Sequence, residues 1–379
     1  MYEKNYNRPN NRQERLTTVI SPPDVPLLII IACISLVGIM AVFSSSVAHG
    51  IHDFNDHLYF FKKQLVNFII GTVSMFYFMN KFNYKRIQKK IDLISNTTIG
   101  LLIATHLFGS TIYGSKRWLF FFQPSELAKF ACVAIIADGL IHSKTIWDAH
   151  FLKRVFAVLV ILVLIMLQPD LGTAVVVFLG CLATCVIGGI SMSLLGSGLA
   201  TFTMLAGFSI THMAHQRERI VGWLNPWADP YDKGYNLIQS WYAISAGGFW
   251  GVGFGNSKQK LLWLPLGHID FIFAIFSEEM GFLGCIILLG LFLGLMHRGF
   301  LIAKNCHDEF GKLLAFGMTS VVLAQALINI CVAVGLMPVT GVTLPLISYG
   351  GTSVIVTMSM FGILLNISRQ KIKRIKANA

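Results

Sequence analysis

Asp270 is the residue whose type and position point most directly to chemistry. It follows His268 and Ile269, where a polar segment meets a long apolar stretch. A carboxylate at the edge of a membrane span is costly to keep there, so it is a functional candidate by default. The preceding segment, 213–269, is large enough to hold a lipid headgroup. The pattern predicts a general base that takes a proton from a hydroxyl of a lipid-linked sugar.

A second charged group lies earlier, at the start of another apolar stretch. Glu126 and Lys129 are three residues apart, so on a helix they share a face and can pair. The pair could be a structural anchor or part of a site, and the sequence favours neither. Just upstream, Lys116, Arg117 and Trp118 combine an arginine fork suited to phosphate with a ring suited to the membrane interface.

Asp170 lies in a short polar turn, 168–173, between two apolar stretches. Such an aspartate often caps the following helix, and that structural role would explain it fully. The alternative is a polar contact inside a central cavity.

Several other residues receive structural interpretations. The glycines at 251, 253 and 255 are not a nucleotide-binding loop, because no strand–helix unit surrounds them; they are expected to let backbone pass close to other groups. Glu278 and Glu279 lie about 12 Å beyond Asp270 if that stretch is a helix. We expect them to tie helices together or to line an inner polar path.

These residues must be positioned by membrane helices. Of the 379 residues, 55% are hydrophobic and only 13% charged, about half the charged share of a soluble domain. Recurring apolar runs of about 20 residues predict an all-α polytopic membrane protein. We expect ten spans, at 25–47, 64–79, 91–109, 125–141, 154–168, 171–189, 193–212, 270–296, 312–336 and 352–368. The seven cysteines show no zinc or disulfide spacing and are interpreted as small core residues.

Ten spans place both termini on one side of the membrane. With the termini inside, the inner segments contain 20 of the 30 Lys and Arg residues, as the positive-inside rule requires. This makes 1–24 and the basic 369–379 cytoplasmic tails and 25–368 a single membrane domain, with 213–269 as a large outer loop between spans seven and eight. The first 24 residues show no cleavage site of a signal peptide.

The other ten Lys and Arg residues lie outside the predicted inner segments, against the positive-inside rule. Most of them lie in 110–129 and 213–260. Outer loops tolerate some Lys and Arg, so the grouping could be incidental. The interpretation we favour is an anionic ligand on the outer face, with Lys258 among its contacts. The net charge of +12 falls in short loops beside spans, which indicates a membrane protein and not a nucleic-acid-binding one.

Seven stretches, in order, resemble the signature motifs of the SEDS family of bacterial membrane proteins (shape, elongation, division and sporulation). They are Gly-Ser-Lys-Arg-Trp at 114–118, Gln-Pro-Ser-Glu-Leu-Ala-Lys at 123–129, Gln-Pro-Asp-Leu-Gly-Thr at 168–173, Gly-Tyr-Asn-Leu-Ile-Gln-Ser at 234–240, His-Ile-Asp-Phe-Ile-Phe-Ala at 268–274, Glu-Glu-Met-Gly at 278–281 and Leu-Pro-Leu-Ile-Ser-Tyr-Gly-Gly at 344–351. Segments 224–230, 253–260 and 338–341 are more similar to the division branch of the family than to its elongation branch.

The resemblance implies a ten-span fold and a peptidoglycan glycosyltransferase that polymerises lipid II, the undecaprenyl-pyrophosphate-linked disaccharide peptide, at the outer face of the bacterial cytoplasmic (inner) membrane. It implies a class B penicillin-binding transpeptidase and other divisome membrane proteins as partners, and no nucleic acid. The family's essential aspartate falls on Asp270. Its usual neighbours fall on Arg117, Glu126, Lys129, Asp170 and His268. We add Lys116, Lys258 and Ser348 to the expected substrate contacts.

The chain departs from the family pattern beside this aspartate. Ile269 stands where Thr is usual, and Leu266-Gly267 replaces a pair that usually begins with Glu. The loss of that Glu puts in doubt any role of its position, but not the role of Asp270.

In the implied reaction, the C4 hydroxyl of one sugar attacks C1 of another and a lipid pyrophosphate leaves. Asp270 would be the base, and Arg117, Lys129 and Lys258 would stabilise the charge that grows on the pyrophosphate. In-line displacement inverts the sugar centre and gives a β-linkage. A divalent cation, Mg²⁺ or Mn²⁺, could share this charge, although the sequence shows no dedicated metal cage.

Two other functions are open. A transporter or lipid II flippase would use intramembrane charges as a polar path, such as those of Glu126, Lys129, Asp138 and Glu278. A structural scaffold would only position the transpeptidase. We favour the enzyme because the polar groups concentrate at the outer face, around a large loop.

Overall fold

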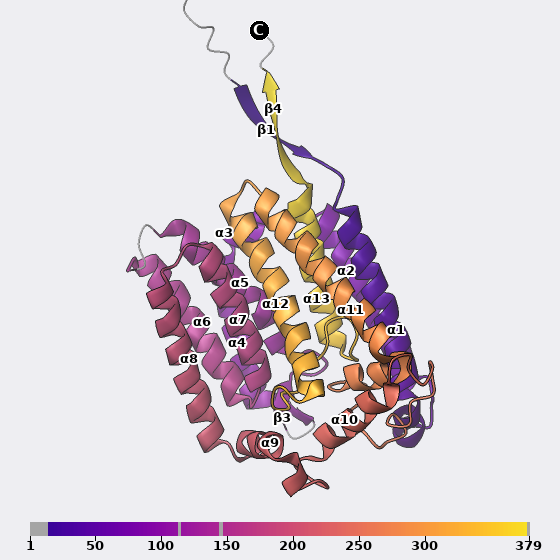
Figure 1. The fold of residues 1–379 in the computed structure, drawn as a ribbon. Coiled ribbons are helices and arrows are strands. Elements are labelled where there is room, and N and C mark those ends of the chain that lie inside the picture. Colours follow the sequence, from indigo (N-terminus) through magenta and orange to yellow (C-terminus); the bar gives the residue numbers. More distant parts are fainter. Residues whose placement is uncertain (1–13, 113–114, 144–146, 377–379) are drawn as a thin grey trace, which may run out of the picture.

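The structure is a computed structural model that describes residues 14–112, 115–143 and 147–376 (Figure 1). The outer parts of both predicted tails, and Gly114 of the first motif, lie outside these residues. Within the described chain, ten long helices form one bundle and coincide with the ten predicted spans. They are α1 (Val25–Phe54), α2 (Tyr59–Asn80), α4 (Ile91–Phe108), α5 (Pro124–His142), α6 (Ala149–Leu167), α7 (Leu171–Ile187), α8 (Met192–His212), α11 (Ile272–Asn305), α12 (Glu309–Val334) and α13 (Gly351–Arg369).

Seven of these helices are long and apolar enough to cross a membrane, namely α1, α4, α6, α8, α11, α12 and α13. α7 is apolar, but it is one residue shorter than the shortest of the helices counted as long enough to cross a membrane. α5 carries three charged residues along its length. In α13, 78% of the most apolar window is buried, against 11% in α8. α13 therefore lies inside the bundle, and α8 lies at its edge.

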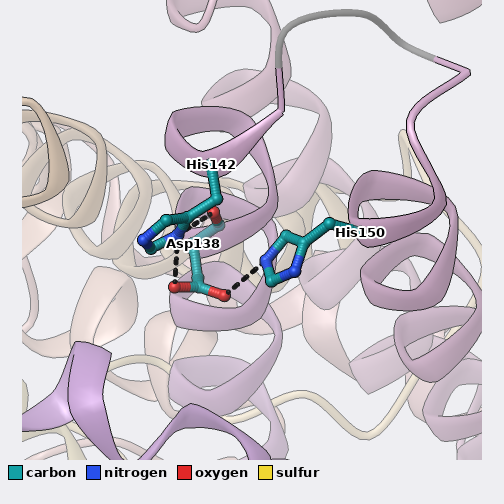
Figure 2. Close-up of side chains that lie close together, drawn as sticks. All are labelled: Asp138, His142 and His150. Carbon is teal, nitrogen blue, oxygen red and sulfur yellow. Dashed lines mark hydrogen bonds and ion pairs between the residues drawn. The ribbon is translucent and has the colours of Figure 1, made fainter.

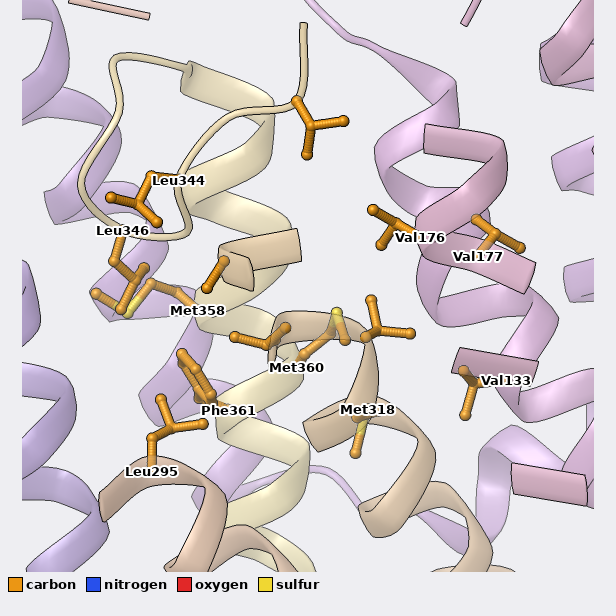
Figure 3. Packing of buried hydrophobic residues seen from close by; sticks show 14 of the residues in the cluster. Val133, Val176, Val177, Leu295, Met318, Leu344, Leu346, Met358, Met360 and Phe361 are labelled. Carbon is orange, nitrogen blue, oxygen red and sulfur yellow. The ribbon is translucent and has the colours of Figure 1, made fainter. Parts of the chain in front are cut away.

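The core is built by side chains from many helices and one irregular segment. Figure 3 shows part of this buried cluster, including Val133 of α5, Val176 of α7, Met318 of α12, Phe361 of α13 and Leu344 of the segment before α13. That segment, 335–350, contains no helix, yet it runs through the interior. Two of its backbone carbonyls, those of Val342 and Thr343, accept from amide side chains of α12, as irregular backbone at membrane depth requires.

Both described chain ends lie at one end of the bundle. β1 (Glu14–Ile20) pairs antiparallel with β4 (Gln370–Lys376), and the short helix α3 (Lys85–Lys89) lies at the same end (Figure 1). Both ends of the described chain thus lie together, as an even number of spans requires, and the predicted tails contain these paired strands. At the opposite end, β2 (Ser110–Ile112) pairs with β3 (Ser115–Trp118).

The predicted outer loop 213–269 is not without structure. It contains α9 (Ala214–Leu224), a short 3-10 helix at Pro226–Ala228 and α10 (Tyr235–Gly247), which lie across the end of the bundle that carries β3 (Figure 1). Sequence reasoning missed these helices because they are short, and α9 is largely polar. They place the loop's charged residues against the ends of the membrane helices.

The span predicted at 270–296 corresponds to α11, but it contains a break that the sequence did not predict. α11 starts at Ile272, and Gly281 interrupts it with φ +66. Segment 248–253 replaces the lost helical hydrogen bonds: Val252 N donates to Glu278 O (3.0 Å), and Phe282 N donates to Gly248 O (2.9 Å). A Cβ on Gly251 would lie 2.2 Å from Glu279 O, so the predicted close backbone approach at this glycine is confirmed.

Candidate active site at one end of the bundle

Three charged side chains from distant parts of the chain face the same small space beside Gly341. A Cβ built on Gly341 would lie 3.7 Å from Asp270 Oδ2, 3.7 Å from Arg117 Nη1 and 3.8 Å from Arg219 Nη1. Arg117 comes from β3, Arg219 from α9 and Asp270 from the segment just before α11. The structure therefore brings together one carboxylate and two guanidinium groups, as a site for a diphosphate beside a base requires.

Asp270 is held by its backbone. Its N–H donates to Leu266 O (3.1 Å), and its carbonyl accepts a hydrogen bond from Asn329 Nδ2 (2.8 Å). The same amide nitrogen donates to Val342 O (2.7 Å), next to Gly341. Asn329 was not predicted as a site residue; the only signal was an amide within an apolar span. It fixes Asp270 relative to Gly341 and leaves the carboxylate facing the arginines.

The surroundings of Asp270 change its acidity. Burial raises the pKa of the Asp270 carboxyl above its ordinary value, while Arg219 and then Arg117 lower it and Asp170 adds a further small increase. The net direction is upward. A raised pKa suits a general base, because a stronger base takes a proton more readily once it is ionised.

Arg117 is held by the turn before α7. Its Nε donates to Gln168 O (3.3 Å), its Nη2 donates to Pro169 O, and its Nη1 lies 3.5 Å from Asp170 Oδ1. Asp170 also accepts from Thr173 N (3.3 Å), so the predicted helix cap is confirmed. The alternative is supported as well, because this buried carboxylate holds a guanidinium that faces Asp270.

Glu126 and Lys129 form an ion pair inside the bundle. Glu126 Oε2 and Lys129 Nζ are 2.6 Å apart, and the two side chains are 6% and 3% exposed. Lys129 Nζ also donates to Gln325 Oε1 (2.7 Å), whose amide nitrogen donates to Thr343 O (2.9 Å). The structure thus places Lys129 in the wall behind the site, with its ammonium group occupied. These contacts support the structural interpretation of the pair, and the expected contact of Lys129 with pyrophosphate stays a prediction.

Asp270 lines a polar cavity of about 280 Å³. The cavity lies between α9, the start of α10 and the segment before α11. Its ionisable lining residues are His215, Glu218, Arg219, Asp232, Lys233 and Asp270. Arg219 was predicted only as one of a group of outer cations. Here it joins Asp270 to this cavity, and its guanidinium also donates to Val339 O (3.2 Å).

The residue before Asp270 lines a different cavity. Ile269 borders a space of about 650 Å³ that is mostly apolar and is bounded by Lys62 and Lys63 at the start of α2. Its aromatic lining residues are Phe54, Tyr59, Phe60, Trp118, Phe120, Phe121 and Tyr349. The 269–270 segment therefore separates a polar cavity from an apolar one.

His268 and Ser348 have structural contacts. His268 is buried, with its ring centroid 4.7 Å from that of Phe60 and 4.9 Å from that of His49. Burial, with a smaller contribution from His49, lowers the pKa of His268 to about 3, so the ring is neutral. Ser348 Oγ accepts from Leu344 N (2.8 Å) and closes a turn. Neither side chain lines the polar cavity, so the expected substrate contacts are not visible in this structure.

The two remaining predicted contacts, Lys116 and Lys258, are exposed and lie outside the linings of both cavities. The backbone N–H of Lys258 donates to Glu278 Oε1 (2.9 Å). Glu279 Oε1 accepts from Lys260 Nζ (2.9 Å) and from Ser44 of α1 (2.5 Å). The prediction that these residues tie helices together is therefore confirmed for Glu279, which links α11 to α1, whereas Glu278 fastens the loop to α11.

Comparison with known proteins identifies relatives along nearly the whole chain. The FTSW_RODA_SPOVE family, described as cell cycle protein, matches residues 25–373. Stage V sporulation protein E of Bacillus subtilis is 36% identical over 369 residues, which cover 93% of this chain and 99% of that protein. The probable peptidoglycan glycosyltransferase FtsW of Trichlorobacter lovleyi is 34% identical over 355 residues, covering 91% of this chain and 93% of that protein.

Two solved structures share the fold. One, described as showing structural coordination of polymerization and crosslinking by a peptidoglycan synthase complex, has a TM-score of 0.74 at 30% identity and covers 92% of this chain and 98% of that one. The rod shape determining protein RodA of Thermus thermophilus has a TM-score of 0.68 at 26% identity, covering 92% and 97%. The chain is therefore a multi-pass membrane protein that belongs to the FtsW/RodA/SpoVE family of cell cycle proteins.

Proposed function

We propose that this protein is a peptidoglycan glycosyltransferase that polymerises lipid II into β-1,4-linked glycan at the outer face of the cytoplasmic membrane, with Asp270 as its general base. The observation that carries the proposal is the convergence of Asp270, Arg117 and Arg219 beside Gly341, at the edge of a polar cavity. The FtsW relatives, which are named probable peptidoglycan glycosyltransferases, support the same reaction.

The reaction needs one proton acceptor and positive charge near the leaving group. Asp270 takes the proton from the C4 hydroxyl of the acceptor sugar. At the same time, the oxygen of that hydroxyl bonds to C1 of the donor sugar. The bond from C1 to the pyrophosphate oxygen breaks, and undecaprenyl pyrophosphate leaves with that electron pair. Arg117 and Arg219 stabilise the growing negative charge, an electrostatic contribution worth roughly 10²–10³-fold in rate for one donor group.

The two cavities give this reaction room for two substrates. Donor and acceptor are both lipid-linked, so each has an apolar tail and a polar headgroup. The 650 Å³ cavity is apolar, aromatic and flanked by two lysines, and the 280 Å³ cavity is polar. Ile269 borders the apolar cavity and Asp270 borders the polar one. A headgroup bound in each cavity would therefore meet the other beside Asp270.

The site does not fit a metal held by the protein. Among the described residues, no group of three His, Cys, Asp or Glu ligands surrounds Asp270, and Asp170 faces the guanidinium of Arg117. Mg²⁺ or Mn²⁺, if it takes part, would be bound mainly by the pyrophosphate. No step above depends on it.

We further propose that the protein acts in septal wall synthesis during cell division, with a class B penicillin-binding transpeptidase and other divisome membrane proteins as its partners. The FtsW relatives support the division role, and the similar synthase complex supports a crosslinking partner. The similarity to a sporulation protein and to RodA makes sporulation and elongation the alternative roles. Localisation of a fluorescent fusion to the septum, and filamentation on depletion, would support division; loss of rod shape on depletion would contradict it.

A flippase is the alternative activity. A transit path needs charges free to contact the headgroup, whereas the ammonium of Lys129 is engaged by Glu126 and Gln325, and both Glu278 and Glu279 are bound by residues of the 257–260 loop. These contacts favour the enzyme. A flippase would move labelled lipid II across vesicles without making polymer.

The decisive experiment is a glycan-ladder assay with purified protein, lipid II and a candidate transpeptidase partner. Wild-type protein is expected to give polymer, and Asp270→Asn is expected to give none, because loss of a base costs roughly 10²–10⁴-fold. Asp53→Asn is the matched control, since Asp53 is an exposed carboxylate at the end of α1. Full polymerisation by Asp270→Asn would overturn the assignment of the base.

A further inference from the structure

We propose that Asp138, His142 and His150 form a binding site for one divalent transition-metal ion, best suited to Zn²⁺, at the opposite end of the bundle from Asp270. The three side chains come from the last turns of α5 and the first turn of α6. Their candidate ligand atoms all lie within 4.8 Å of one another. Figure 2 shows both imidazole rings facing the Asp138 carboxylate from two sides.

The spacing agrees with metal coordination after a small adjustment. His142 Nδ1 lies 3.0 Å from Asp138 Oδ1, and His150 Nε2 lies 3.2 Å from Asp138 Oδ2. Zn²⁺ holds nitrogen and carboxylate ligands at about 2.0–2.2 Å, so tetrahedral ligand atoms lie ~3.4 Å apart. Asp138 and His142 are four residues apart on one helix, and His150 closes the site from the next helix. A fourth position would be left for water.

A further residue orients the carboxylate. Arg154 Nε donates to Asp138 Oδ2 (2.8 Å), and Arg154 Nη1 contacts Asp92 Oδ1 of α4 at 2.6 Å. Metal-binding carboxylates are commonly held by such outer hydrogen bonds, which fix the oxygen that faces the metal. With Arg154 on Oδ2, Asp138 would offer to the ion the Oδ1 atom that His142 faces, and the ring of His150 would turn from Oδ2 toward the ion.

The burial pattern allows an ion to enter. Asp138 is 2% exposed, whereas the side chains of His142 and His150 are 49% and 34% exposed. The carboxylate is thus fixed in the bundle, and the two imidazoles form an accessible rim. Histidine nitrogens with one carboxylate select Zn²⁺ and similar metals over Mg²⁺ and Ca²⁺, which prefer oxygen ligands.

The bound ion would join α5 to α6 across their connection. Asp138 lies 12 residues along α5 from Glu126, or roughly 18 Å from it along the helix axis. The ion would therefore act on stability and on the position of α5, and not on the chemistry at Asp270. The same contacts without metal form a hydrogen-bonded network around Asp138, and the experiment must separate these two cases.

The test uses tag-free protein in detergent, stripped with chelator and dialysed against Zn²⁺. Bound metal is measured by mass spectrometry, and stability by thermal melting. We expect about one ion per chain, and a melting temperature raised by ~4 °C or more. The double variant His142→Ala/His150→Ala should lose both effects. Asp92→Asn is the matched control: it breaks the Arg154 contact of the network but removes no ligand, so it should keep the ion.

Co²⁺ supplies a second readout that does not depend on stability. Co²⁺ bound in place of Zn²⁺ should give visible absorption of a tetrahedral centre in wild-type protein and none in the double variant. Less than a tenth of an ion per wild-type chain would overturn the proposal. Equal metal content in wild type and double variant would also overturn it, because the ion would then be adventitious.

Discussion

Asn329 joins Asp270 to the loop that carries Gly341. One amide nitrogen donates both to the carbonyl of Asp270 (2.8 Å) and to the carbonyl of Val342 (2.7 Å). Asp270 and the loop that faces it are therefore positioned by a single side chain of α12.

Replacing Asn329 with Leu should impair the reaction more than it impairs folding. Two carbonyls would lose their donor, which costs about 1–3 kcal/mol per buried group. Asp270 would then be free to move relative to Arg117 and Arg219. We expect thermal melting to show a modest loss of stability and glycan synthesis to fall at least tenfold. Asn329→Gln should restore part of the activity if positioning is the cause, whereas equal activity of Asn329→Leu and wild type would contradict this role.

Polymerisation should depend on pH through the Asp270 carboxyl. Its ordinary pKa is 3.8 and burial raises it, so activity should increase with pH through an inflection above that value. Arg219 is the larger of the two influences that lower this pKa. Arg219→Gln removes the positive charge, so the pKa rises and the inflection moves to higher pH. Initial rates of glycan formation across a pH series would measure the shift. An inflection at lower pH in the variant would contradict the electrostatic role of Arg219.

Glycan synthesis should not tolerate a side chain at position 341. A matched glycine shows whether backbone strain or the added methyl group is the cause. Gly341 has φ +74, and its Cβ would project among Asp270, Arg117 and Arg219. Gly189 has φ +78, but a Cβ there meets nothing within 4 Å. Alanine at either position carries similar backbone strain, so both variants should lose similar stability in thermal melts. Only Gly341→Ala should lose glycan synthesis, since only there does the methyl group occupy the space of the substrate.

The position of Asp270 could be predicted from sequence, because a carboxylate at the edge of an apolar run is a strong and local signal. The ten helices could be predicted for the same reason, since apolar runs of about 20 residues stand out in any chain. Both signals come from the local sequence and do not depend on contacts with distant parts of the chain.

Arg219 and the break at Gly281 depend on contacts distant in sequence. Arg219 reaches Asp270 only because α9 folds across the end of the bundle, and nothing in its local sequence separates it from the other outer cations. Gly281 can leave the helix because segment 248–253 supplies the missing hydrogen bonds. The sequence shows the glycines in both places, but not that they meet. The contact between Lys129 and Gln325 of α12 also joins residues that are distant in sequence, so the sequence alone does not show it.

The Glu126–Lys129 pair allows a test of whether Lys129 contributes structure or substrate binding. Lys129→Met would leave the Glu126 carboxylate buried without its partner, and breaking such a pair costs about 3–5 kcal/mol. The double variant Glu126→Gln/Lys129→Met removes both charges, so thermal melting should show most of that loss recovered. Because the ammonium of Lys129 lies in the wall and contacts Glu126 and Gln325, the double variant should also keep most of its glycan synthesis. A double variant that melts like the wild type but makes no polymer would restore Lys129 to the substrate site.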